Sequence, residues 1–121
     1  MRKIYAMFAA LLLVGIVSAQ PCPDSLYLTS QAQLDNFQIL YPNCTEIEGD
    51  VYISGGDIIN LNGLNVLTSV GEKLYIRDNP ALISLTGLDN LTSVGISIYI
   101  QNNAVINSLI GLESMASVDI S

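Results

Sequence analysis

The chain has 121 residues, of which 50% are hydrophobic, and it carries eleven acidic against four basic side chains, for a formal net charge of −7. Nucleic-acid binding needs a basic stripe on the surface, so this charge balance excludes nucleic acid as a partner. The chain contains no histidine, and its two cysteines alone cannot form a tetrahedral zinc site.

Residues 1–19 have the pattern of a secretory signal peptide. Arg2 and Lys3 supply a positive start, 6–17 is an apolar run too short to span a bilayer, and 17–19 is a small-residue cleavage signal. An uncleaved membrane anchor is the alternative, but the run ends in small residues without a positive flank. We therefore expect a secreted or cell-surface protein with no membrane insertion after cleavage.

Residues 20–48 predict an N-terminal cap with a helix and a disulfide. Cys22 and Cys44 both survive signal cleavage, and in an oxidising compartment a single disulfide between them is the favoured state. Ser30 can cap a helix over 31–41, which Pro42 and Asn43 would stop. The apolar face of that helix is expected to hold Leu34, Phe37, Leu40 and Tyr41.

The second half of the chain repeats itself with a period of 24 residues. The two clear copies, 71–94 and 95–118, read GEKLYIRDNPALISLTGLDNLTSV and GISIYIQNNAVINSLIGLESMASV. A degenerate copy covers 49–70, and 119–121 match the opening of an incomplete fourth. A unit this short cannot bury its own apolar face, so it must stack on its neighbours.

Within each repeat, the spacing of the apolar residues changes partway along the sequence. Residues 74–76 and 98–100 alternate with period two and predict short parallel strands. Leucines then recur every third residue, a spacing that suits 3₁₀-like turns, and Gly63, Gly87 and Gly111 mark tight corners. Together these patterns predict an all-β solenoid over 49–121, a right-handed β-helix or leucine-rich-repeat-like stack of 24-residue rungs with a disulfide-stapled helical cap.

The strand motifs LYIRDN and IYIQNN resemble the L-x-L-x-x-N core of leucine-rich repeats. With the cap cysteine, the helix, NCTEIEGDVYI and the S-L-x-G-L turns, the chain is similar over about 22–118 to the receptor L domain of insulin-receptor and epidermal-growth-factor-receptor ectodomains, and to exported bacterial surface proteins. The resemblance implies that a sheet face binds a ligand. The chain departs from the family pattern in two ways. Gly56 occupies the repeat position that is asparagine at 79 and 103, and the sequence ends at 119–121 without a closing cap.

The missing cap predicts a truncated copy of a larger protein. It also predicts end-to-end self-association through the uncapped C-terminal rung, because an open strand edge pairs with another chain.

A tyrosine column is the candidate ligand-binding surface. Tyr52, Tyr75 and Tyr99 each lie between inward aliphatic residues, so strand alternation points all three outward from one sheet, about 4.8 Å apart. Stacked rings flanked by polar groups suit the binding of a peptide or a sugar ring. The alternative is structural, because tyrosine has high strand propensity. The expected polar neighbours are Asp50, Ser54, Lys73, Arg77, Ser97 and Gln101, of which Lys73, Arg77 and Gln101 are further candidate ligand contacts.

Other candidate sites are weaker. Asn43 and Asn90 open N-x-S/T sequons and would accept glycans in a eukaryotic source. Glu46, Glu48 and Asp50 alternate, but Ca²⁺ needs six to eight oxygens and a shaped loop, so we expect no metal site.

No catalytic constellation stands out. The chain has no histidine, no cysteine expected to be free and no glycine-rich phosphate loop, and Asp50 is matched in later repeats by Lys73 and Ser97, so no acidic column forms. We expect a non-catalytic recognition module without a cofactor that binds an extracellular protein, peptide or glycan through an exposed sheet face. The alternative is a structural spacer or adhesin segment of a larger surface protein with no ligand of its own.

Overall fold

The computed structural model describes residues 20–103, 106, 111–112 and 115. The predicted signal peptide, 1–19, and the start of the predicted fourth repeat, 119–121, lie outside the described residues.

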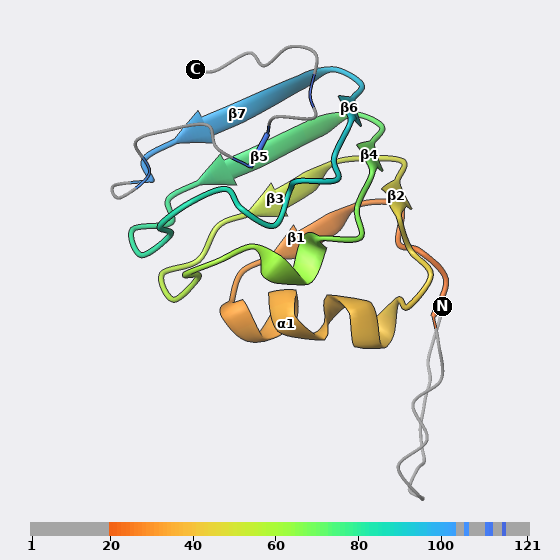
Figure 1. Cartoon of the computed structure of the whole chain (residues 1–121), viewed down its shortest axis with the longest axis horizontal. Helices are drawn as coiled ribbons and strands as arrows, with labels where there is room; N and C mark the ends of the chain where they lie inside the picture. Colours follow the sequence, from red (N-terminus) through yellow and green to blue (C-terminus); the bar gives the residue numbers. More distant parts are fainter. Residues whose placement is uncertain (1–19, 104–105, 107–110, 113–114, 116–121) are drawn as a thin grey trace, which may run out of the picture.

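Two parallel sheets form the framework of the described chain (Figure 1). The larger sheet consists of β1 (Leu26–Leu28), β3 (Val51–Ile53), β5 (Lys73–Arg77) and β7 (Ser97–Gln101), in that order. The smaller sheet consists of β2 (Glu46–Ile47), β4 (Ser69–Val70) and β6 (Ser93–Val94). Because the chain visits the two sheets in turn, each strand returns parallel to its predecessor in the same sheet.

The predicted parallel pairing of the repeats is confirmed. Leu74 pairs with Ile98 and Tyr75 with Tyr99 where β5 meets β7. The register continues into the chain before the clear repeats, because β3 pairs with β5 on one side and with β1 on the other. The two sheets therefore include strands from residues 20–48, the segment that the sequence predicts to be a cap.

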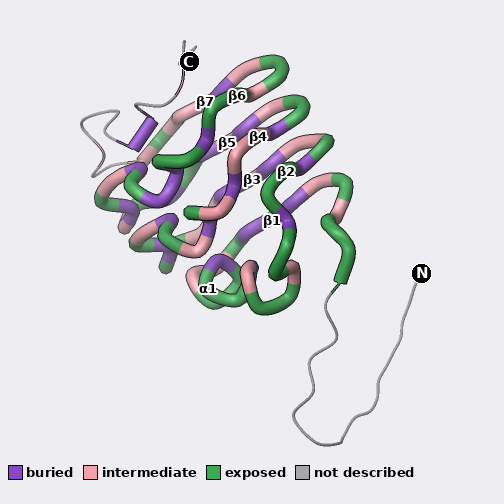
Figure 2. The backbone as a smooth tube through the Cα atoms, turned by 45° about the vertical axis from the view of Figure 1, so that its right-hand side comes forward, coloured by how far each residue is buried: buried purple, intermediate pink, exposed green. Residues whose placement is uncertain are grey.

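Aliphatic side chains of the strands alternate inward and form one core. Burial alternates along β1, β3 and β5 (Figure 2), and the inward residues of β3 and β5 are fully buried. Leucines of the loops join them at three-residue spacing. The loop residues in this core are Leu61, Leu64, Leu67, Leu82, Leu85, Leu88 and Leu91.

The helix α1 (Gln31–Leu40) begins at the predicted cap, where the Ser30 hydroxyl accepts a hydrogen bond from the Gln33 N–H at 3.2 Å. Leu34 and Phe37 are buried in the core as predicted, but Leu40 is 37% exposed. The helix packs beside the short 3₁₀ helix η1 (Asn62–Leu64).

The turns between the sheets are of the predicted 3₁₀-like kind. The N–H of Leu88 donates to the carbonyl of Leu85 at 3.1 Å, and that of Leu91 to Leu88 at 3.0 Å. Gly87 has a φ of +117° and lies against the Leu61 backbone, where a Cβ atom would clash. The glycine is therefore required at this corner both by its backbone conformation and by lack of space.

The predicted all-β solenoid is wrong. The described residues form a small α/β fold of two parallel sheets and one helix, and they do not close into a solenoid or a β-helix. One reason is that α1 contributes Leu34 and Phe37 to the common core instead of standing outside an all-β coil. The other is that the backbone N–H groups of Leu82, Leu88 and Leu91 bond within their own turns, and the described loops form no third sheet.

The predicted disulfide is confirmed. Cys22 and Cys44 are bonded with their Cα atoms 5.3 Å apart, and no free cysteine occurs among the described residues. The bond ties the chain before β1 to the turn that follows α1, and a disulfide is compatible with an extracellular protein. Within the described part of the chain, no helix has both the length and the apolarity to cross a bilayer.

Candidate recognition surface

Four tyrosines form a continuous stack on the outer face of the larger sheet. The ring centroids of Tyr52 and Tyr75 are 4.1 Å apart, and those of Tyr75 and Tyr99 are 4.9 Å apart. Tyr27 continues the stack at 5.3 Å from Tyr52. The planes of neighbouring rings differ by at most 18°, so the stack offers a nearly uniform aromatic edge.

The strands fix this geometry. Tyr27, Tyr52, Tyr75 and Tyr99 are register partners across the sheet, and each stands between two inward aliphatic residues. Parallel strands repeat every 4.7–4.9 Å, which is the spacing at which aromatic rings stack. Tyr27 is 61% exposed, while the other three rings are half-buried. The tyrosine stack therefore presents its most open ring at the β1 edge.

Sequence reasoning missed Tyr27. The signal was present, because Leu26-Tyr27-Leu28 repeats the aliphatic–tyrosine–aliphatic pattern of the later strands. The tripeptide lies before α1, outside the part of the chain where the repeat is apparent.

The local environment opposes ionisation of Tyr52. The pKa of Tyr52 is raised above its ordinary value by a side-chain hydrogen bond with Tyr75, by burial and by the negative charge of Asp50. Asp50 itself accepts a hydrogen bond from the Lys73 backbone N–H at 3.0 Å. The Tyr52 phenol thus remains neutral at physiological pH, and a neutral phenol can both donate and accept hydrogen bonds.

Lys73, Arg77 and Gln101 lie on the strands of the tyrosine stack as the sequence predicts. Arg77 pairs in register with Gln101, and Lys73 with Ser97. The Arg77 Nε lies 3.4 Å from the Asp78 Oδ2, with both side chains about half exposed. An exposed ion pair of this kind is weak, so the guanidinium can be diverted to a bound carboxylate.

An asparagine ladder closes the end of the larger sheet. The Asn79 Oδ1 accepts from the Gly55 N–H at 2.8 Å, and its Nδ2 donates to the Ile53 carbonyl at 3.0 Å. The Asn79 Nδ2 also donates to the Asn103 Oδ1, whose own Nδ2 donates to the Ile76 carbonyl. The ladder satisfies backbone groups beyond the strand ends, so it serves the fold rather than a ligand.

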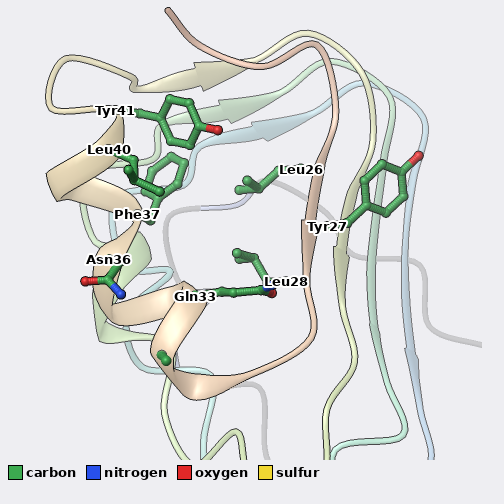
Figure 3. Close-up of a pocket in the computed structure, with 9 residues that line it drawn as sticks. Leu26, Tyr27, Leu28, Gln33, Asn36, Phe37, Leu40 and Tyr41 are labelled. Carbon is green, nitrogen blue, oxygen red and sulfur yellow. The ribbon is translucent and has the colours of Figure 1, made fainter. Parts of the chain in front are cut away.

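Two hollows lie near the first strands. One, of about 280 Å³, is formed by β1 and α1 (Figure 3). The other, of about 330 Å³, lies beside the disulfide and is lined by Asp24, Asn43, Glu46 and Glu48 among others. In the described part of the chain, no three acidic or cysteine side chains are grouped so that they could hold a metal ion.

The two candidate glycosylation sites differ in their surroundings. Asn43 is exposed beside the second hollow, directly before the disulfide-bonded Cys44. Asn90 is exposed too, but its side-chain amide donates to the Asn65 carbonyl. A glycan on Asn90 would therefore have to replace that hydrogen bond.

The chain was compared with protein-family models, with curated proteins and with solved structures. None of them matches it. Its function is accordingly inferred from its own geometry.

Proposed function

We propose that the protein is a non-catalytic recognition module whose tyrosine stack (Tyr27, Tyr52, Tyr75 and Tyr99) binds an extracellular protein, peptide or glycan. The observation that carries the proposal is the run of four rings in stacking contact, which stays partly open to solvent along the whole sheet face. Tyrosine supplies a large contact area at a low cost in side-chain entropy and still offers its hydroxyl for hydrogen bonds.

We also propose that the protein is secreted or displayed on the cell surface. The confirmed disulfide and the signal-like residues 1–19 support this proposal. A relationship to receptor L domains likewise stays a proposal, supported by the cap cysteine, the helix, NCTEIEGDVYI and the S-L-x-G-L turns together with the strand motifs LYIRDN and IYIQNN.

A structural spacer is the second candidate function. The close Tyr52–Tyr75 stacking favours it, because cross-strand aromatic pairs stabilise a sheet whether or not a ligand is present. In that case the tyrosine stack would strengthen the fold, and the protein would only extend other domains from a surface.

The double substitution Tyr75→Ala/Tyr99→Ala separates the two functions. Partners would first be selected from a peptide display library and a glycan array using the unmodified protein. If the stack is a recognition surface, the double variant should bind the selected partner at least about tenfold more weakly while its melting temperature stays close to that of the wild type.

The matched control is Ile83→Ala, because Ile83 is an exposed apolar residue of a loop outside the larger sheet. Binding by this variant should be unchanged. A library that yields no partner, together with a large fall in melting temperature for Tyr75→Ala/Tyr99→Ala, would favour the spacer.

A further inference from the structure

We propose that the open edge of β1 and the hollow beside α1 form a groove for an extended peptide with an aliphatic–aromatic–aliphatic sequence flanked by basic residues. The peptide would add to the larger sheet as a parallel strand next to β1. This inference goes beyond the proposed function, because the groove borders the tyrosine stack only at Tyr27. The groove is defined by the hollow's lining residues Leu26, Tyr27, Leu28, Ala32, Gln33, Asn36, Phe37, Leu40 and Tyr41.

The first argument is the backbone of β1. Among the described residues it is an edge strand whose single sheet neighbour is β3. The Leu26 N–H donates to Asp50 at 2.9 Å and the Leu28 carbonyl accepts from Ser54 at 3.0 Å, so both residues bond toward β3. Because successive residues of a strand direct their backbone groups to opposite sides, the N–H and carbonyl of Tyr27 face away from β3. Neither has a hydrogen-bond partner among the described residues, and such an edge is a template for strand addition.

The second argument is the shape of the space beside that edge. Leu26 and Leu28 project from β1 toward the helix, where Phe37 and Leu40 face them, while Tyr27 points to the opposite side of the strand (Figure 3). A strand added beside β1 has the same alternation. Its central side chain would lie on the Tyr27 side, and the flanking ones would enter the apolar hollow.

The third argument is the sequence pattern that the strands of the larger sheet share. All four strands of the larger sheet carry an aliphatic–tyrosine–aliphatic tripeptide, and their tyrosines stack in register. Tyr27 stacks on Tyr52 with one face and is 61% exposed. An aromatic residue in an added strand would cover that open face in the way that each ring covers the next.

The fourth argument is charge. Residues 20–48, which supply both walls of the groove, contain four acidic residues and no lysine or arginine. Asp24 lies two residues before the start of β1, Asp35 lies on α1, and both are exposed. Basic residues at the ends of a bound peptide would be attracted to this segment and would raise the association rate.

The test uses a synthetic peptide with the sequence of β5, KLYIR, acetylated and amidated at its ends. In the proposed register its tyrosine lies opposite Tyr27, its leucine carbonyl accepts from the Tyr27 N–H, and its isoleucine N–H donates to the Tyr27 carbonyl. N-methylation of the isoleucine removes that donor and keeps every side chain. It should weaken binding in isothermal titration by about two- to tenfold. N-methylation of the peptide's tyrosine, whose N–H faces solvent, is the matched control and should change binding by less.

Variants of the protein locate the peptide. Leu40→Asp places a charge in the hollow and should weaken KLYIR binding about tenfold or more. Ile39→Asp is its control, because Ile39 is the neighbouring exposed residue of α1 and does not line the hollow.

Three results would overturn the proposed groove: no binding of KLYIR, equal weakening by the two N-methyl groups, or equal weakening by the two aspartate variants. Binding that is lost in Tyr75→Ala/Tyr99→Ala but kept in Leu40→Asp would also overturn it, while supporting the tyrosine stack as the recognition surface. Retained binding in Tyr75→Ala/Tyr99→Ala supports the groove, because those rings lie on strands that do not border it.

Discussion

Replacement of Asn79 by leucine is expected to lower the free energy of unfolding by about 3 kcal/mol. Asn79 is fully buried, and its amide bonds the Gly55 N–H, the Ile53 carbonyl and the Asn103 side chain. Leucine has a similar size but no polar atoms, so it would leave these groups without partners inside the fold. The change should lower the melting temperature by about 10–20 °C for a domain of this size.

Urea or thermal unfolding followed by circular dichroism measures this effect. The matched control is Asn36→Leu, at an exposed asparagine on α1, which should leave stability within about 0.5 kcal/mol of the wild type. If the two variants unfold at the same midpoint, the asparagine ladder does not support the sheet as described.

Removal of the disulfide should have a comparable effect. In the chain-entropy model a bond that joins residues 22 positions apart stabilises the folded state by about 3 kcal/mol. The double variant Cys22→Ser/Cys44→Ser should therefore unfold at a lower urea concentration, and amide exchange in α1 should rise before exchange in β5. The bond encloses β1 and α1, so these elements lose their tether directly.

The oxidised wild type at matched protein concentration is the control for this comparison. Two free thiols in the natively produced protein would contradict the bond, and equal midpoints for the two forms would contradict its contribution to stability.

Several local features could be predicted from the sequence because their signals are local. Ser30 precedes a helical apolar pattern and caps α1, and the two cysteines had no competing partner. Tyr75 and Tyr99 stand in strands that are near-copies of each other, so their stacking follows from pairing one copy on the next. The backbone role of Asn79 and Asn103 follows from the same alignment.

The fold class could not be predicted, because it depends on long-range packing. Strands β2, β4 and β6 have two residues each, too few for a periodic pattern to be read. β1 pairs with β3 although α1 and β2 intervene, so the first strand joins the sheet from inside the segment predicted to be a cap. The all-β coil was predicted because residues 20–48, including the helix, were assigned to a cap outside the repeat core.

The candidate site could be predicted only in part, because some of its geometry also depends on long-range packing. The outward direction of Tyr52, Tyr75 and Tyr99 is set by strand alternation, which sequence shows. The groove lies between β1 and α1, and only the tertiary structure shows how these two elements are placed relative to each other. Leu40 illustrates the difference: its helical spacing predicts burial with Phe37, but it stands partly exposed at the wall of the hollow.

The most direct test of the recognition surface is an aromatic NMR titration of the mature protein with a partner selected from the library or array. Each tyrosine can be assigned by single substitution with phenylalanine. The proposed function predicts that the ring signals of Tyr52, Tyr75 and Tyr99 shift with the partner's concentration while those of Tyr41, which packs on Phe37, do not. Saturable binding that leaves the signals of the tyrosine stack unmoved would contradict it.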